Sequence, residues 1–173
     1  NEEIQSFYSD NAGELKKAAR EMKWRAPTSS PGRPQSNGVA EAAVDAVKRG
    51  CRVNLTQSGL DTSWWPYAIT HLCFSKNTEV VNSESPYSLR HGEQCTAKLI
   101  PFGALVDFQP VPNPNDRQGP FETRTRKGIL IGYHMQPGGK WSQDYLVAEY
   151  DAFKQNPETT PKEVKVHRTR EVY

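Results

Sequence analysis

The pattern of apolar and polar positions changes along the chain near residue 100. Before it, apolar residues recur every three or four positions and predict helices over residues 13–24, 38–56 and from about 62 onward. After it, short β-prone runs are separated by Pro, Gly, Asn and Gln. These runs cover residues 102–111, 128–133, 145–150 and 164–172. The chain is therefore predicted to be α+β, with helices first and a small antiparallel barrel or sheet after a boundary near Leu99.

A strand is also predicted close to the start of the chain. Ile4 to Ser9 alternate weakly in polarity, and the run ends at Asp10, so the strand would deliver an acidic residue at its carboxyl end. The segment from Ala26 to Pro34 holds three prolines, two serines and a glycine, which predicts a loop. That loop either closes over a ligand or simply connects two elements.

The helix predicted from Gly38, with Asn37 as its N-cap, has one charged side. Four charged residues fall within roughly 60° of one another on it: Glu41, Asp45, Lys48 and Arg52. Apolar residues gather on the opposite side: Val39, Ala43, Ala46, Val47, Gly50 and Val53. Glu41 and Asp45 are a like-charge pair one turn apart, which weakens a helix unless a cation lies near. Either a metal ion binds there, or the side is a solvated face on which Asp45 pairs with a basic neighbour.

A third helix is predicted from Thr62, with Asp61 or Thr62 as its cap and Pro66 in its first turn. Its apolar side, which we expect to be core rather than a binding surface, carries Trp65, Ile69, Leu72 and Cys73. Three cysteines and four histidines are dispersed without the spacing of a disulfide framework or a zinc site. The cysteines, Cys51, Cys73 and Cys95, are expected to be buried small residues in a reducing compartment.

Charge and length narrow the possible functions without choosing one. The 173 residues carry 22 Lys+Arg against 20 Asp+Glu, a net charge of +2, so nucleic-acid affinity would have to come from local clusters. One cluster between the first two predicted strands comprises Arg117, Arg124, Arg126 and Lys127. Phosphate contacts and a solvated loop explain this cluster equally well. No apolar run could span a bilayer, nothing resembles a signal peptide, and a first residue that is Asn indicates a fragment or a processed product.

Several motifs resemble, in the same order, those of retroviral-type integrases, most closely those of copia-type retrotransposons. SDNAGE at residues 9–14 and PQSNGVAE at 34–41 resemble the second and third acidic motifs of that family. Three segments resemble the region downstream of the catalytic core in copia-type polyproteins: SWW at 63–65, SPYSLRHG at 85–92 and PFG at 101–103. RTRKGILIGY at 124–133 and RTREVY at 168–173 are similar to the family's downstream small β-domain.

The resemblance implies the carboxyl-terminal half of a ribonuclease H-like core, followed by a small β-domain with an SH3-like barrel or similar fold. In such a core three carboxylates hold two divalent cations, which activate the attacking oxygen and stabilise the leaving oxygen of a phosphodiester. Oxygen ligands suit Mg²⁺ or Mn²⁺. By this match, Asp10 and Glu41 are two of the catalytic, metal-holding carboxylates. The residues implied to contact nucleic acid are Gln35, Asn37, Lys48, Arg49, Arg52, Arg124, Arg126 and Lys127.

The reaction implied is removal of terminal nucleotides from element DNA, followed by strand transfer into target DNA. A homo-oligomer acting in the nucleus, or in a cytoplasmic virus-like particle, is implied too, with no membrane and no small-molecule substrate. The family's first carboxylate would precede Asn1, its zinc module does not occur in this sequence, and the 31 positions from Asp10 to Glu41 are several fewer than usual. We therefore expect the chain alone to be inactive.

Under this interpretation residues 1–60 belong to the integrase core, residues 61–99 form a helical extension and connector, and residues 100–173 form the β-domain. Two other hypotheses remain open. The chain could be a nucleic-acid-binding or assembly module without chemistry, or it could be a decayed transposon relic with no selected role.

Overall fold

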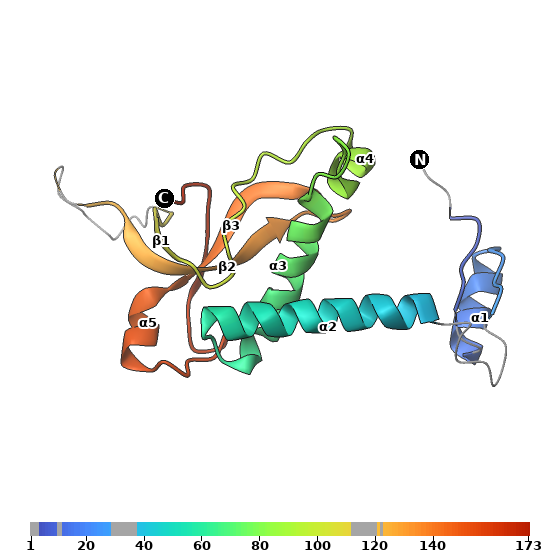
Figure 1. Ribbon diagram of the computed structural model, residues 1–173, viewed down its shortest axis with the longest axis horizontal. Coiled ribbons are helices and arrows are strands. Elements are labelled where there is room, and N and C mark those ends of the chain that lie inside the picture. The colour runs from blue at the N-terminus through green and yellow to red at the C-terminus, as the bar shows by residue number, and fades with distance from the viewer. Residues whose placement is uncertain (1–3, 10–11, 29–37, 112–120, 122) are drawn as a thin grey trace. The chain divides into compact units, whose positions relative to one another are not determined.

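A computed structural model of the protein describes residues 4–9, 12–28, 38–111, 121 and 123–173 (Figure 1). Its elements include helices and a four-stranded antiparallel sheet, so the predicted mixed α+β class is confirmed. Contacts between residues divide the chain into two compact units, residues 1–46 and 47–173. The long helix α2 (Gly38–Ser58) runs across this division.

In the first unit, two extended segments run parallel to each other and are joined by helix α1 (Gly13–Glu21). Bridges between them pair Ser6 with Arg25 and Ser9 with Thr28. The Arg25 N–H donates to the Gln5 C=O at 3.0 Å. Over the predicted strand at residues 4–9 the structure shows isolated bridges rather than a regular strand, and α1 joins two short parallel segments.

A tight turn at the end of α1 makes this arrangement possible. Lys23 adopts a left-handed conformation with a φ of 56°. The Trp24 N–H then donates to the Ala19 C=O at 2.9 Å, and the Lys23 N–H donates to the Arg20 C=O at 3.1 Å. This pattern is a Schellman motif, which satisfies the last carbonyl groups of a helix and reverses the chain. Its left-handed position usually holds glycine, whereas here it holds a lysine.

In the second unit, the sheet has the strand order β1-β2-β3-β4, with every pair antiparallel. Its strands are β1 (Leu105–Phe108), β2 (Arg126–Met135), β3 (Trp141–Glu149) and β4 (Val166–Thr169). The last residues return to the first strand, because Val172 bridges Phe108 and the backbones of Asp107 and Tyr173 exchange hydrogen bonds of 2.8 and 3.0 Å. The four predicted strands therefore form one meander whose end pairs with its beginning.

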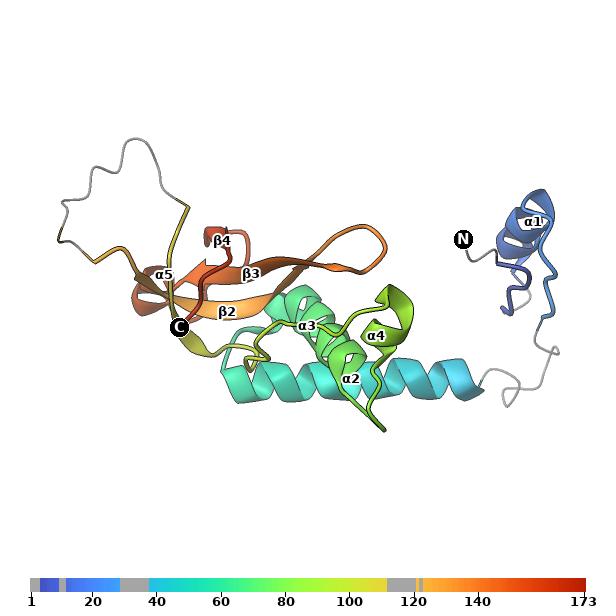
Figure 2. The ribbon, with the colours of Figure 1, turned by 90° about the horizontal axis from the view of Figure 1, so that it is seen from above.

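Helices cover one side of this sheet. A 3-10 helix, η2 (Thr62–Trp64), leads into α3 (Trp65–Thr78), which crosses the C-terminal half of α2 and packs on β2 (Figure 2). The predicted start is confirmed, because the Asp61 side chain accepts from the Ser63 N–H at 2.8 Å and Pro66 lies in the first turn of α3. Two short helices were not predicted: α4 (Pro86–His91) and α5 (Tyr150–Gln155).

The sheet and the helices of the second unit share two hydrophobic clusters. One brings α2 and α3 against β2, β3 and α5, and contains Cys51, Leu60, Trp64, Ala68, Phe102, Ile129, Ile131, Ala148, Phe153 and Val164. The other lies between α3 and the sheet, and contains Phe74, Val106, Phe108, Leu130, Tyr133, Tyr145, Val147 and Val172. The compact units therefore do not follow the predicted boundaries near residues 60 and 99, and the three-part division stays a prediction.

The buried side of α2 differs from the predicted apolar side. Val39 and Val53 are 89% and 60% exposed. The residues that turn inward lie roughly a quarter turn away and are Val47, Gly50, Cys51, Asn54, Leu55 and Ser58. Gly50 lets the Leu72 side chain approach closely, and the Asn54 amide donates to the Ala68 C=O at 3.4 Å. The buried face of α2 is therefore the one on which α3 can pack closely at Gly50 and accept a hydrogen bond from Asn54, and not simply the most apolar one.

Two other predictions about the core are wrong. Trp65 is 55% exposed and Cys73 is exposed, whereas the buried side of α3 carries Ala68, His71, Phe74 and Thr78. The neighbouring Trp64 is fully buried instead, and its indole N–H donates to the Thr159 C=O at 2.8 Å. Of the three cysteines only Cys51 is buried, and Cys95 is half-buried.

Candidate functional site

The N-terminal half of α2 presents Glu41 to solvent. Glu41 lies in the first turn of the helix, where the positive end of the helix dipole favours a carboxylate. Asp45 follows one turn later and is also exposed. The predicted charged side of the helix is therefore exposed at both acidic positions.

Basic residues continue on the same helix. Lys48, Arg49 and Arg52 are all exposed, and the Arg52 Nε donates to the Lys48 C=O at 3.4 Å. By helical spacing, Lys48 and Arg52 lie on the side that carries Glu41. Within the described part of the chain, no ion pair is recorded for any of these three side chains. Their charges are therefore available to an anionic partner.

Asp10, Gln35 and Asn37 lie outside the described residues, and so does the N-cap predicted at residue 37. Segments 4–9 and 25–28 are parallel, so their carboxyl ends lie at the same edge of the first unit.

The basic residues of the β-domain lie at the start of β2. Arg124 and Lys127 are exposed, and Lys127 is the cross-strand neighbour of Asp107. Arg126 approaches Glu149 at 3.8 Å across the neighbouring strand. The same Glu149 oxygen lies 2.7 Å from Nε2 of the buried His167. Arg126 of this predicted cluster is therefore paired with an acidic residue of the sheet, and Lys127 lies opposite another. Arg124 precedes β2 and is exposed. Arg117 lies outside the described residues.

A further charged cluster was missed by the sequence predictions. Asp144 on β3 receives Arg168 at 2.6 Å and Arg170 at 3.5 Å from the neighbouring strand and its continuation. The hydrogen bond from Arg168 is the main cause that lowers the pKa of the Asp144 carboxyl. The alternating arginines of RTR at 168–170 could have indicated a basic strand face, since alternate residues of a strand share a face. Their acidic partner, however, is distant in sequence.

Of the two carboxylates expected to bind a metal, Glu41 lies in the described part of the chain. An exposed carboxylate such as Glu41 is a hard oxygen ligand of the kind that fits Mg²⁺ or Mn²⁺. Among the described residues, no group of three or more His, Cys, Asp or Glu side chains is placed to hold a metal ion. Asp10, the other carboxylate expected to bind a metal, lies outside these residues.

Comparisons with known proteins do not identify the chain: no protein-family model matches it, and no curated protein matches it either. Among the described helices, none combines the length and the apolar character that a membrane span requires.

Proposed function

We propose that this chain is part of a retroviral-type integrase of the copia-type retrotransposon branch and that it acts on DNA. The observation that carries the proposal is the order of elements before Glu41. Two parallel segments joined by α1 are followed by a long helix with an acidic residue in its first turn. A ribonuclease H-like core needs this order, because it brings acidic residues from a strand end and a helix start to one edge. The ordered sequence motifs support the same proposal.

The proposed chemistry divides between Asp10, Glu41 and a third carboxylate outside this chain. These three would hold the divalent cations, which supply activation of the attacking oxygen and stabilisation of the leaving oxygen. Glu41 contributes a carboxylate that is already exposed and favoured by the helix dipole. Lys48 and Arg52 would bind backbone phosphates further along the helix, with Gln35 and Asn37 near its start, and so orient the DNA strand.

Residues 100–173 would be the downstream small β-domain, with an SH3-like fold. Support comes from its short antiparallel meander and from the return of Val172 to β1, which begins to close the sheet. Arg124, Arg126 and Lys127 would contact phosphates there, together with Arg49 on α2. Element ends, target DNA, a homo-oligomer and action in the nucleus are part of the same proposal.

The decisive experiment uses a longer parent protein that supplies the first carboxylate. Glu41→Gln removes one metal-binding charge but keeps the size of the side chain, so we expect loss of Mg²⁺-dependent joining of labelled DNA ends with DNA binding retained. Asp45→Asn is the matched control, because it removes the same charge one turn along the same helix face. Joining that persists in Glu41→Gln, or that is lost equally in Asp45→Asn, would contradict the assigned role of Glu41.

The second candidate function is a nucleic-acid-binding or assembly module without chemistry, or a relic of one. The exposed Lys48 and Arg49, which have no ion pair within the described residues, favour binding whether or not catalysis occurs. Binding driven by phosphates must weaken steeply as salt rises. If the longer parent binds DNA with this salt dependence but fails to join ends, the non-catalytic candidate replaces the integrase.

A further inference from the structure

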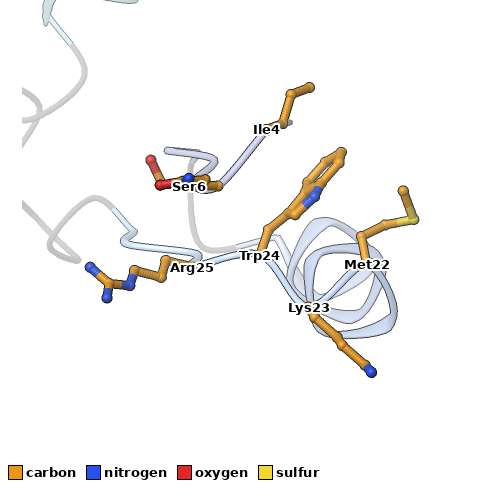
Figure 3. A pocket seen from close by; sticks show the side chains of 7 residues that line it. Ile4, Ser6, Met22, Lys23, Trp24 and Arg25 are labelled. Carbon is orange, nitrogen blue, oxygen red and sulfur yellow. The ribbon is translucent and has the colours of Figure 1, made fainter. Parts of the chain in front are cut away.

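A hollow in the first unit combines an indole ring with two cations. It has a volume of about 690 Å³ and is lined by Ile4, Gln5, Ser6, Met22, Lys23, Trp24 and Arg25. Figure 3 shows the half-buried Trp24 ring standing between the Ile4 and Met22 side chains. Both of these apolar neighbours are 58% exposed. The hollow therefore offers an accessible aromatic face with a flexible thioether beside it.

The charges around the hollow favour an anionic occupant. Lys23 and Arg25 are exposed, and neither has a recorded ion pair within the described residues. The segment of residues 12–28, which contains both, carries five basic and two acidic side chains. The whole chain is nearly neutral, so positive charge is concentrated in this segment.

The backbone at Lys23 adds an independent observation. The left-handed conformation there favours glycine and is costly for a residue with a Cβ. A lysine nevertheless occupies it and is thereby placed directly before the indole. The Schellman turn at the end of α1 thereby fixes a positively charged residue next to the indole.

We propose that this hollow binds a short single-stranded nucleic-acid segment, with one unpaired base stacked on Trp24 and the flanking phosphates on Lys23 and Arg25. Every base has a π-face, so stacking on an aromatic ring tolerates any sequence. In Figure 3 the Lys23 and Arg25 side chains, which flank Trp24 in the sequence, extend in different directions. A strand that continues on both sides of the stacked base offers a phosphate to each cation, and we therefore propose an oligonucleotide as the occupant rather than a free nucleotide.

This inference rests on the proposed function for its choice of a nucleic-acid partner over an acidic peptide. It is distinct from the metal chemistry, since it involves neither Asp10 nor Glu41. An unpaired base near a DNA end is a substrate feature that an enzyme processing DNA ends would meet.

The test is equilibrium binding of the full 173-residue chain to a labelled oligothymidylate of about eight nucleotides, within the ~4–16 that single-strand-binding folds cover. Fluorescence anisotropy gives the affinity. Trp24→Ala is expected to weaken binding by roughly 5- to 150-fold, and Trp24→Phe by less, because a phenyl ring still stacks. Trp65→Ala is the matched control, since Trp65 is an exposed tryptophan in the other unit, and it should leave binding unchanged.

The cations are tested by salt dependence. Lys23→Gly removes the charge while suiting the left-handed turn, so a loss of binding cannot be blamed on misfolding. Lys23→Gly and Arg25→Ala should each reduce the slope of log affinity against log salt by about 0.7, the value for one phosphate contact with a single strand. Lys17→Ala, which removes an exposed lysine that does not line the hollow, should change the slope less.

Several outcomes would overturn the proposal: unchanged binding in Trp24→Ala, equal loss in Trp65→Ala, blunt duplex bound as tightly as the single strand, or an acidic peptide as the better ligand. Oligouridylate in place of oligothymidylate distinguishes RNA from DNA as the source of the strand. The two experiments are independent. If Trp24→Ala does not weaken oligonucleotide binding, the end-joining test of Glu41 still stands, and if Glu41→Gln does not abolish joining, the binding test of the hollow still stands.

Discussion

The connector between α4 and β1 is held to the sheet by the Tyr133 hydroxyl, and removing that one group tests how the second unit is stabilised. The hydroxyl accepts from the Ile100 N–H at 2.9 Å and donates to the Lys98 C=O at 3.1 Å. The ring is buried and stacks on Phe74 with centroids 4.1 Å apart. Tyr133→Phe therefore removes two hydrogen bonds and keeps the packing of the ring.

The expected cost is set by these contacts. Two hydrogen bonds at about 0.5–1.5 kcal/mol each give about 1–3 kcal/mol. Ile100 is half-buried and Lys98 is exposed, so water replaces part of the loss and about 1–2 kcal/mol is expected. With a typical urea slope of about 2 kcal/mol/M for a small protein, the unfolding midpoint should fall by about 0.5–1 M.

Urea unfolding followed by circular dichroism measures this shift. Tyr145→Phe is the matched control and should cost less, because within the described residues the Tyr145 hydroxyl has one recorded hydrogen bond, accepted from the Lys98 N–H at 2.9 Å. Stability equal to the wild type in Tyr133→Phe, or a larger loss in Tyr145→Phe, would refute the reasoning.

The same hydroxyl predicts a dependence on alkaline pH. Burial raises the pKa of Tyr133 from its ordinary value of 10.0 to about 12. A raised folded-state pKa means that its contribution is complete below pH 10.0 and is lost as pH rises toward about 12. Tyr133→Phe should lack this component of the alkaline decline, and an identical decline in both proteins would contradict it.

Two further changes test other parts of the second unit. Gly103→Ala should destabilise it by more than about 1–2 kcal/mol, because Gly103 combines a φ of 79° with a Cβ position 2.2 Å from the Ser58 Cβ. Gly92→Ala, at a φ of 70° in open space, should cost only the backbone strain, and equal thermal shifts in the two variants would show that the Ser58 contact is unimportant. Asp144→Asn should remove part of the acid sensitivity, since Arg168 lowers the pKa of Asp144 below its ordinary 3.8 and the stabilisation is therefore lost as pH falls through that lowered value. An unchanged acid unfolding midpoint in Asp144→Asn would contradict this role.

Sequence alone could predict only those features of the candidate site that depend on residues close together in the chain. The charged face of α2 follows from helical spacing, and exposure of Glu41, Lys48 and Arg52 agrees with it. The hollow around Trp24 could not be predicted, because it depends on the pairing of Gln5 with Arg25 across α1. The sequence between them predicts a helix, but not the left-handed turn at Lys23 that folds one segment beside the other.

Sequence alone determined the order and type of most elements, because their causes are local. Spacing of apolar residues located α2 and the four strands, and Asp61 with Pro66 located the start of α3. Tertiary structure alone decided which faces are buried. Trp64 and Trp65 are adjacent and chemically identical, yet only Trp64 is fully buried. The difference arises because burial depends on where distant elements pack, and no local property of two neighbouring tryptophans encodes the position of the sheet.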